Sequence, residues 1–326
     1  MPLQPHHFDF LLLPEFSFIG FAALVEPLRI ANRFQPGAYQ WRIVSLDGQA
    51  VTASNGIALQ PQARLEDASQ AQVIFAIASF NPLKHYTRSM GRALRNRWQA
   101  GAVLGAVDTG SFILAEAGLL EGAPVTLHWE AIPAFRERYA QLKVREEARF
   151  TISPRVMTSA GGMASVDLVL ELISRDYGSA LALQVSEQLV SGWVRDRADH
   201  QRLHISARYK VHNAKVTQVI EAMEQQLENP LPGDLLAQQV GVTRRQLERL
   251  FQEHMGMSPI QLYLTLRLER ARHLLRQSSM DVTEVAMACG FASTSAFSRA
   301  YRRHFDVAPS NDRQERLPAT LTTPAA

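Results

Sequence analysis

Two stretches near the C-terminal end share one pattern: GDLLAQQVGVTRRQLERLFQEHMGMSP (residues 233–259) and DVTEVAMACGFASTSAFSRAYRRHFDVAP (residues 281–309). The first contains Ala237 and Gly241, which recur 49 residues later as Ala286 and Gly290. At an offset of 50, Leu247, Phe251, His254 and Pro259 are matched by Phe297, Tyr301, His304 and Pro309. Each copy has a short helical pattern, a glycine turn, a second helical pattern and a proline, the order of a helix-turn-helix motif. The repeat predicts two such motifs in one helical domain.

The outward positions of each second helix are the predicted DNA-reading positions, because the N-terminal half of a recognition helix meets base edges. In the first copy, Thr243 and Gln246 have the spacing of a capping box, so Thr243 begins that helix. In the second copy the predicted cap is Ser293. The DNA-reading candidates are Arg244, Arg245, Glu248 and Arg249 in the first copy, and Thr294, Ser295, Ser298, Arg299 and Arg302 in the second.

A helix is predicted over residues 259–277, between the two motifs. At 1.5 Å per residue it is about 28 Å long, enough to hold two recognition helices roughly one DNA turn, ~34 Å, apart. It carries Arg267, Arg270, Arg272 and Arg276, which we expect to add to a basic surface. Because arginine reads guanine bidentately and grips phosphate, the predicted partner is double-stranded DNA.

The net charge of +3 is concentrated in the last third of the chain. Residues 208–326 hold 15 Lys/Arg and 12 Asp/Glu, whereas residues 1–207 hold 19 of each. This asymmetry is consistent with a polyanionic partner for the last third, although three charges are also compatible with a solvated face.

The 326 residues include one cysteine, Cys289, which excludes an intrachain disulfide and a cysteine-based zinc site. In its apolar setting Cys289 is interpreted as core packing rather than as a redox switch. Sparse histidine and aspartate clustering argues against any metal site, and no cofactor is predicted. No apolar stretch approaches the ~20 residues that span a bilayer, and the N-terminus lacks the features of a signal peptide. We therefore expect a cytoplasmic protein that does not interact with membranes.

Apolar strand-like runs alternate with helical patterns over the first two thirds of the chain. The runs are residues 8–13, 41–46, 73–78, 103–107 and 156–159, and the helical patterns include 18–33, 83–99, 165–177 and 180–194. Continuous apolar strands between helices are typical of a mostly parallel sheet covered on both faces. The prediction is a flavodoxin-like α/β sandwich followed by an all-α domain. The expected limits are residues 1–194 for the first domain, 195–212 for a polar linker, 213–316 for the helical domain and 317–326 for a flexible tail.

Residues 213–313 closely resemble the AraC/XylS family of transcriptional regulators. The resemblance is carried by Arg245-x-Leu247-x-Arg249-x-Phe251, Gly256-x-x-Pro259, Leu266-Arg267-Leu268, Cys289-Gly290-Phe291 and Phe297-Ser298-Arg299. It implies two helix-turn-helix units joined by a helix, sequence-specific DNA binding, and activation of transcription through contact with RNA polymerase.

Residues 6–190 resemble the class I glutamine amidotransferase-like superfamily, in particular the PfpI-like branch that is often fused to AraC-type domains. The matching stretches include Leu13-Pro14-x-Phe16-Ser17, Glu26-Pro27-Leu28, Thr109-Gly110-x-Phe112 and Ser159-Ala160-Gly161-Gly162. Enzymes of this branch place a cysteine nucleophile at a sharp turn between a strand and a helix. Asp108 stands at that elbow here, and an acidic partner common in active relatives falls near Gly20. The departure predicts a fold without its reaction, and the alternative is an amidase-like or hydratase-like enzyme with a DNA-binding tail.

A pocket without a nucleophile is interpreted as a ligand sensor at the carboxyl ends of the strands. The candidate ligand-binding residues are Phe16, Asn55, Phe80, Asn81, Asp108, Thr109, His128 and Trp129. In one reading Asp108 is the counter-ion of a cationic effector within aromatic walls; in the other it only caps the elbow helix. Relatives with this fusion often respond to amino acids or quaternary amines such as arginine, glycine betaine and carnitine, so the resemblance implies a small nitrogenous effector. The apolar helices at 165–177 and 180–194 favour a homodimer.

Overall fold

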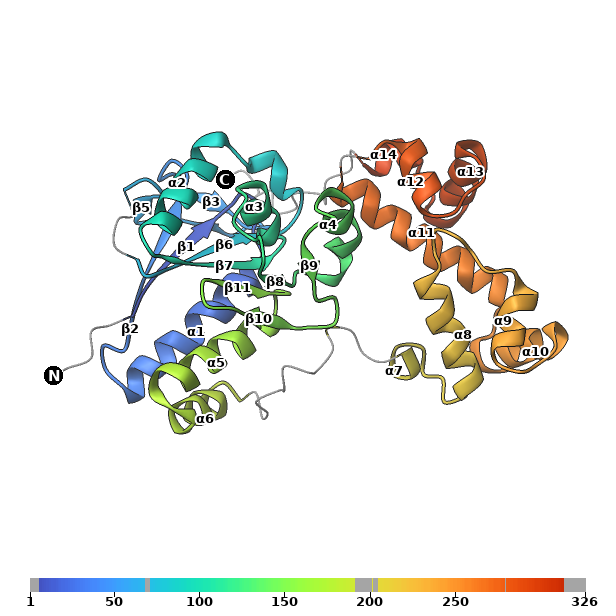
Figure 1. Cartoon of the computed structure of the whole chain (residues 1–326), viewed down its shortest axis with the longest axis horizontal. Coiled ribbons are helices and arrows are strands. Elements are labelled where there is room, and N and C mark those ends of the chain that lie inside the picture. The colour runs from blue at the N-terminus through green and yellow to red at the C-terminus, as the bar shows by residue number, and fades with distance from the viewer. Residues whose placement is uncertain (1–5, 68–70, 191–200, 202–204, 279, 314–326) are drawn as a thin grey trace, which may run out of the picture. The chain divides into compact units, whose positions relative to one another are not determined.

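The computed structural model describes residues 6–67, 71–190, 201, 205–278 and 280–313, which form two compact units (Figure 1). One unit contains the described residues up to Gln201, and the other contains those from Ile205 onward. The predicted tail and residues 195–200 and 202–204 of the predicted linker lie outside the described residues. The rest of that linker differs from expectation, because α7 (Ile205–Tyr209) packs with Ile205 in the core of the helical unit. The helical unit therefore includes residues before 213.

The first unit is built on a seven-stranded sheet in the order β10-β11-β7-β6-β1-β2-β5. Every neighbouring pair is parallel except β10 with β11. The strands are β1 (His6–Leu12), β2 (Tyr39–Ser45), β5 (Ala63–Arg64), β6 (Val73–Ala78), β7 (Val103–Asp108), β10 (Phe150–Ile152) and β11 (Val156–Ser159). Two small ladders pair β3 (Val51–Thr52) with β4 (Ala58–Leu59), and β8 (Pro124–Val125) with β9 (Lys143–Val144). The mostly parallel sheet confirms the predicted fold class.

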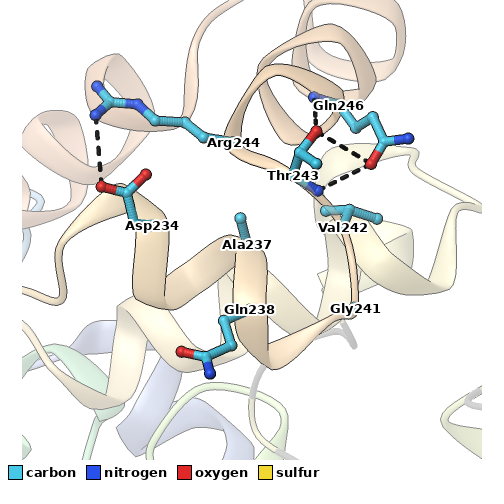
Figure 2. Close-up of a pocket in the computed structure, with 8 residues that line it drawn as sticks. All are labelled: Asp234, Ala237, Gln238, Gly241, Val242, Thr243, Arg244 and Gln246. Atoms are coloured by element: carbon cyan, nitrogen blue, oxygen red, sulfur yellow. Dashed lines mark hydrogen bonds and ion pairs between the residues drawn. The ribbon is translucent and has the colours of Figure 1, made fainter.

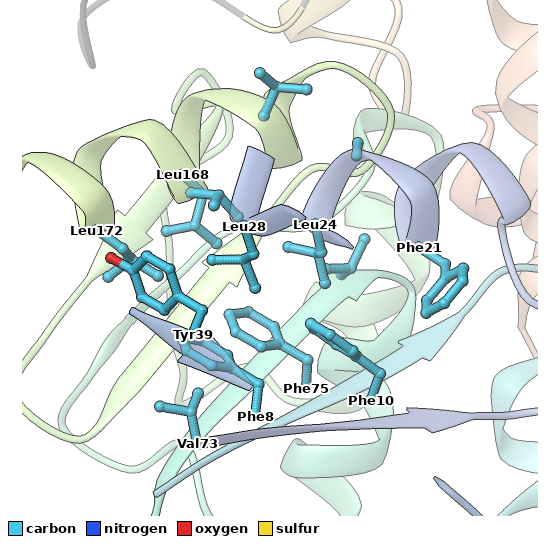
Figure 3. Packing of buried hydrophobic residues seen from close by; sticks show 14 of the residues in the cluster. Phe8, Phe10, Phe21, Leu24, Leu28, Tyr39, Val73, Phe75, Leu168 and Leu172 are labelled. Atoms are coloured by element: carbon cyan, nitrogen blue, oxygen red, sulfur yellow. The ribbon is translucent and has the colours of Figure 1, made fainter. Parts of the chain in front are cut away.

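Helices cover both faces of this sheet (Figure 1). One face carries α1 (Phe18–Phe34), α5 (Ala164–Tyr177) and α6 (Ser179–Gln188), and the other carries α2 (Arg88–Gln99) and α3 (Gly110–Glu116). The remaining segments are η1 (Pro82–His85), η2 (Trp129–Ala131) and α4 (Ile132–Arg138). Between the sheet and α1, the ring of Phe8 stacks on those of Phe10 and Phe75, which are tilted relative to each other (Figure 3). Burial of these rings supplies the main favourable free energy of this layer.

Two predicted helices of the first unit have different bounds in the structure. The pattern over 83–99 divides into η1 and α2, because Thr87 is a new N-cap whose Oγ1 accepts the Met90 N–H at 3.1 Å. The pattern over 180–194 ends as a helix at Gln188, and Val190 has a φ of 54°. Residues 191–194 of that prediction lie outside the described residues.

The second unit is entirely helical in its described residues. Its helices after α7 are α8 (Ala214–Gln225), α9 (Gly233–Gln239), α10 (Arg244–Met255), α11 (Pro259–Gln277), α12 (Val282–Ala288), α13 (Thr294–Phe305) and α14 (Pro309–Asp312). Helix α11 has the predicted bounds of 259–277. Within the described residues, no helix is both long enough and apolar enough to span a membrane.

Candidate nucleic-acid interface and ligand site

The first helix-turn-helix unit consists of α9, a turn and α10. The turn passes through Gly241, whose φ of 64° lies in the left-handed region that glycine adopts without strain. Thr243 caps α10: its Oγ1 accepts the Gln246 N–H at 3.3 Å, and Gln246 Oε1 accepts the Thr243 N–H at 2.8 Å (Figure 2). The predicted capping box is confirmed, and it satisfies two amide groups that a helix N-terminus otherwise leaves unpaired.

The four candidates on α10 are all exposed, but they are not equally available. Arg244 Nε lies 3.2 Å from Glu248 Oε1, and the same guanidinium lies 3.9 Å from Asp234 (Figure 2). Among the described residues, Arg245 and Arg249 form no ion pair. A hollow of about 460 Å³ lies between α9 and the start of α10, lined by Asp234, Ala237, Gln238, Gly241, Val242, Thr243, Arg244 and Gln246. Arg245 and Arg249 are therefore the side chains of this helix that can reach an anion at no cost to an internal pair.

The second helix-turn-helix unit repeats this plan with α12 and α13. Its turn passes through Gly290 at a φ of 71°, and Ser293 Oγ accepts the Ala296 N–H at 3.2 Å. Of the predicted reading residues, Ser295, Arg299 and Arg302 are exposed, and Thr294 and Ser298 are half-buried. A hollow of about 520 Å³ is lined by Val282, Ser298, Arg299, Arg302, Arg303, Ala308, Pro309 and Ser310. Three of these residues are arginines and none is acidic, so the hollow suits an anionic group such as a phosphate.

Three of the four arginines of α11 hold protein groups, contrary to the expectation of a basic DNA-facing surface: Arg267, Arg272 and Arg276. Arg267 donates to the carbonyls of Cys289 and Gly290 at 2.7 and 2.6 Å, and its guanidinium stacks 4.1 Å from the Phe291 ring centre. The guanidinium therefore clamps the turn of the second helix-turn-helix unit onto the connecting helix. Cys289 is fully buried at this turn, and burial raises the pKa of its thiol to about 12. Such a thiol stays protonated, which supports the packing interpretation.

Two further α11 arginines, Arg272 and Arg276, meet at Asp312, on α14. Asp312 is fully buried, with Arg272 Nε at 2.9 Å and Arg276 Nε at 3.0 Å from its carboxylate oxygens. The Tyr301 hydroxyl of α13 donates to the same carboxylate at 2.5 Å. Although burial alone would raise it, the hydrogen bond from Tyr301 and the two guanidinium groups hold the pKa of Asp312 below its usual value. One buried carboxylate thus links α11, α13 and α14, a role that sequence reasoning missed.

The elbow of the first unit lies where β7 passes into α3. Asp108 has a φ of 59°, which is strained for a side chain other than glycine. Thr109 Oγ1 donates to the carbonyl of Ser79 at the end of β6, and a Cβ on Gly161 would lie 3.0 Å from Asp108 Cβ. Gly110 leaves room for the carbonyl of Ala76, which a Cβ there would approach to 2.1 Å. The elbow is therefore tightly packed by backbone from both neighbouring strands.

The Asp108 carboxyl lies in an unusual electrostatic environment. Burial, together with the negative charge of Glu130, raises its pKa to about 8. Burial lowers the pKa of the nearby His128 imidazole, and Glu130 acts in the opposite direction. The N-cap position of α3 is occupied by Thr109, and no side-chain cap bond is formed there. The elbow carboxyl thus precedes the cap and accepts the Thr109 N–H.

The other ligand candidates divide into those near the elbow and those in the core. Ala78 pairs with Asp108 in the sheet register, which brings the following Phe80 and Asn81 to the same edge. The rings of His128 and Trp129 lie 5.6 Å apart between centroids, and both residues are half-buried. Phe16 is fully buried against Phe18 and Phe21 and belongs to the core, so it is not an exposed aromatic wall. Asn55 is exposed, and its Oδ1 accepts the Ile57 N–H in a turn.

Two features of this edge, Glu130 and Gly161, were not among the sequence candidates. Glu130 acts on Asp108 through its charge, and Gly161 packs directly against it. Glu15, with a φ of 62°, lies 3.9 Å from His85 Nε2. The only available signal was position: Glu130 stands two residues after His128, and Gly161 follows a strand end.

At Gly20 a Cβ would lie 3.0 Å from Val107 of β7, directly before the elbow. No group of three potential metal ligands occurs among the described residues.

Comparisons with known proteins match both units. Residues 15–175 match the DJ-1/PfpI family, and residues 236–315 match a helix-turn-helix domain. The chain is 51% identical over 319 residues to the HTH-type transcriptional regulator CdhR of Pseudomonas aeruginosa, covering 98% of this chain and 94% of that protein. It is 40% identical to the HTH-type transcriptional regulator GbdR of the same species, covering 95% and 85%. A crystal structure of an AraC family transcriptional regulator from Pseudomonas putida has 26% identity and a TM-score of 0.52, over 57% of this chain and all of that one.

Proposed function

This chain belongs to the DNA-binding transcriptional regulators that join a DJ-1/PfpI domain to an AraC-type helix-turn-helix domain, and we propose that it activates transcription at a specific DNA site in response to a small nitrogenous metabolite. The observation that carries the proposal is the pair of capped helices, α10 and α13, that present Arg249 and Arg299 at matching positions. In this proposal the protein is a cytoplasmic homodimer that contacts RNA polymerase.

Base reading in the proposed complex is divided between the two helices. Arg245 and Arg249 of α10 would donate to guanine edges, because their guanidinium groups are exposed and hold no acidic partner in the described part of the chain. Ser295 and Arg299 would do so from α13. Arg302 would contact phosphate beside the arginine-lined hollow.

The test of DNA reading is the affinity of Arg245→Ala for a duplex selected from random sequence by the unmodified chain. A lost base contact should weaken binding by about 1–3 kcal/mol and relax the base preference at one position. Arg33→Ala is the matched control, since Arg33 is an exposed arginine in the first unit. Unchanged affinity and unchanged base preference for Arg245→Ala in a mobility-shift assay would refute the assignment.

We propose that the effector site is the elbow, with Asp108 as the anionic contact and Thr109, Asn81, His128 and Trp129 around it. A carboxyl whose pKa is raised to about 8 is mostly protonated at neutral pH, and a cation beside it would favour the ionised form. Half-buried aromatic rings add favourable contacts for a quaternary ammonium group. Cation binding should therefore release a proton from Asp108.

This assignment predicts a pH dependence with a definite sign. The ionised fraction of Asp108 falls roughly tenfold for each pH unit below its pKa. The affinity for a permanently charged amine should therefore rise as pH increases from 6 to 8 and level off above 8. Calorimetric titration with glycine betaine, carnitine and arginine measures this, with Asp108→Asn expected to abolish the dependence. The control is Asp67→Asn, at an exposed carboxylate. An affinity that is flat with pH for an amine that binds would contradict the role of Asp108.

The proposal includes the absence of elbow catalysis, and the DJ-1/PfpI family makes the enzyme alternative worth a direct test. It is supported by Asp108 at the position of the thiol nucleophile and by Gly20 at the position of the acidic partner. A carboxylate does not perform thiolate chemistry. Steady-state assays on amides and isocyanides should give no turnover, whereas turnover that Asp108→Ala abolishes would favour the enzyme.

A further inference from the structure

Gln201 is anchored to the first unit by an unusual number of contacts for one side chain. Its backbone N–H donates to the carbonyl of Glu147 at 3.0 Å. Its Nε2 lies 2.8–3.1 Å from four acceptors: Thr126 Oγ1 and the carbonyl oxygens of Leu127, Glu146 and Ala148. An amide nitrogen has two hydrogens for these four acceptors, so two segments of chain compete for one donor group. Within the described residues, Gln201 Oε1 has no hydrogen-bond partner.

The position of this anchor in the chain gives it significance. Gln201 lies four positions before Ile205, where the first helix of the DNA-binding unit begins. Two of its acceptors, on Thr126 and Leu127, lie directly before His128 in the chain. The segment that carries His128, Trp129 and Glu130 is therefore continuous with the segment that holds Gln201. The last described contact of the first unit is thus made on the loop of the proposed effector site.

A buried hydrogen-bond network joins the same segment to the elbow helix. Ser111 Oγ, on α3, donates to the carbonyl of Thr126 at 3.0 Å. The Thr126 N–H donates to Thr158 Oγ1 of β11 at 2.7 Å, and Thr126 Oγ1 donates to Ala148 at 2.8 Å. Ser111, Thr126 and Thr158 are fully buried. Because solvent does not substitute for a lost partner there, displacement of one group changes the geometry of the next.

We propose that Gln201 is a coupling residue, through which the state of the Asp108 site alters how firmly the chain is held just before the DNA-binding unit. The proposal rests on the proposed function, since it concerns the regulation of the same site. Two connections lead from the elbow to residues 126–127: the charge of Glu130, which acts on Asp108, and the Ser111 bond at the start of α3. Binding of a cation ionises Asp108 beside Glu130 and so changes the charge of the elbow, and residues 128–130 with the adjoining carbonyl of Leu127 shift relative to Nε2. The effector then biases two states: one in which the Gln201 amide is bound to its acceptors, and one in which it is released from them.

The first experiment measures the anchor without effector and without DNA. The readout is tryptic cleavage of the full chain after Arg197 and Arg202, which flank the anchor in the sequence. Gln201→Ala should accelerate this cleavage about fivefold or more, a factor at the lower end of the range that is typical of coupled sites. At about pH 9, where Asp108 is ionised, Asp108→Asn removes the charge of the site and should change the cleavage rate only when Gln201 is present. Gln99→Ala, at an exposed glutamine, is the matched control and should leave the rate unchanged.

The second experiment repeats the double-mutant cycle on affinity for the selected DNA duplex. The combined Asp108→Asn and Gln201→Ala variant should differ from the product of the two single effects by about fivefold or more. Gln201→Met, of similar volume but without the amide, serves the same cycle if thermal melting shows that Gln201→Ala is unfolded. Additive effects in either cycle would overturn the coupling. Non-additive proteolysis together with a lack of amine binding would refute the effector assignment while leaving the coupling intact.

Discussion

The two helix-turn-helix units follow one plan but are held together by different chemistry. In the first helix-turn-helix unit, Phe251 and Leu262 occupy the interior positions, and both are buried and apolar. Fifty residues later the same positions are occupied by Tyr301 and Asp312, which form a buried polar cluster with Arg272 and Arg276. The comparison shows that a repeat conserves the order of helices and turns, whereas the forces that fix the reading helix can be replaced.

Their outer surfaces differ in the same way. The first helix-turn-helix unit presents Arg244, Arg245, Glu248 and Arg249. The second helix-turn-helix unit presents Thr294, Ser295, Ser298 and Arg299 at the matching positions. Arg249 and Arg299 are the one pair that is conserved between the two faces. The first surface is charged and the second is mainly hydroxylic. The two helices therefore offer different donors and acceptors to the two halves of a DNA site.

The largest expected effect separates the apolar core from the polar one. Phe251→Ala should cost about 3–5 kcal/mol in the free energy of unfolding of the helical unit, because it leaves a cavity in a fully buried site. Tyr301→Phe keeps the ring and loses one hydrogen bond to a carboxylate, which costs about 1.5–3 kcal/mol. Native-state hydrogen exchange of the α10 and α13 amides measures both, with the exposed Gln252→Ala as control. Equal losses from the two substitutions would remove the distinction between the cores.

The next effect tests the Asp312 carboxylate at the centre of the second helix-turn-helix unit. Asp312→Ala should cost about 1–3 kcal/mol near neutral pH, because it removes the acceptor of the Tyr301 hydroxyl and of Arg276 and the ion-pair partner of Arg272. The pKa of Asp312 is lowered in the folded state, so its contribution is present above 3.8, the ordinary value, and is lost as pH falls below it. The deficit of the variant should therefore shrink in acid.

Leu262→Ala is the matched substitution in the first helix-turn-helix unit. Because a leucine does not titrate, the cost of this substitution should not change between pH 3 and pH 7 in the way expected for Asp312→Ala. Urea unfolding of the helical unit from pH 3 to pH 7, followed by circular dichroism, makes the comparison. A deficit of Asp312→Ala that is independent of pH would contradict the buried ion cluster.

An effect of similar size concerns DNA reading by the shared arginine. Arg249→Ala and Arg299→Ala should each weaken binding by about 1–3 kcal/mol, but they should relax base preference in different halves of the site, roughly one helical turn apart. Binding to a set of duplexes with single base-pair changes measures this. Loss of preference at the same base pairs in both variants would refute a division of the site between α10 and α13.

The smallest expected effect concerns the caps. Gln246 completes the capping box of α10, and its counterpart on α13 is Ala296, which supplies no such bond. Gln246→Ala should destabilise α10 by about 0.5 kcal/mol, and Ala296→Gln should stabilise α13 by a similar amount. Thermal melting of the two variants and of the unmodified chain tests the pair. Changes of the same sign would show that the cap is not what distinguishes these helix starts.

Much of the helical unit was predictable because its signals are local. A capping box depends on residues three apart, and the Thr243–Gln246 pair has the predicted hydrogen bonds. The connecting helix has its predicted ends, and the strands at 73–78 and 156–159 have their predicted bounds. The roles of the α11 arginines were not predictable, since Arg267 finds its carbonyl acceptors 22 and 23 residues away.

The candidate ligand site shows the same limit. The elbow at Asp108 was visible from the order of strand, turn and helix, but the burial of Phe16 and the influence of Glu130 depend on packing between distant segments. The two-part architecture, the repeated motif and its caps can be inferred from the residues alone, because they follow from hydrophobic periodicity and from spacings within one or two helical turns. Which charged side chains face solvent and which are held inside depends on the packing of the folded chain. A guanidinium or carboxylate takes its role from partners that folding brings together, and nothing in its own neighbourhood of sequence identifies them.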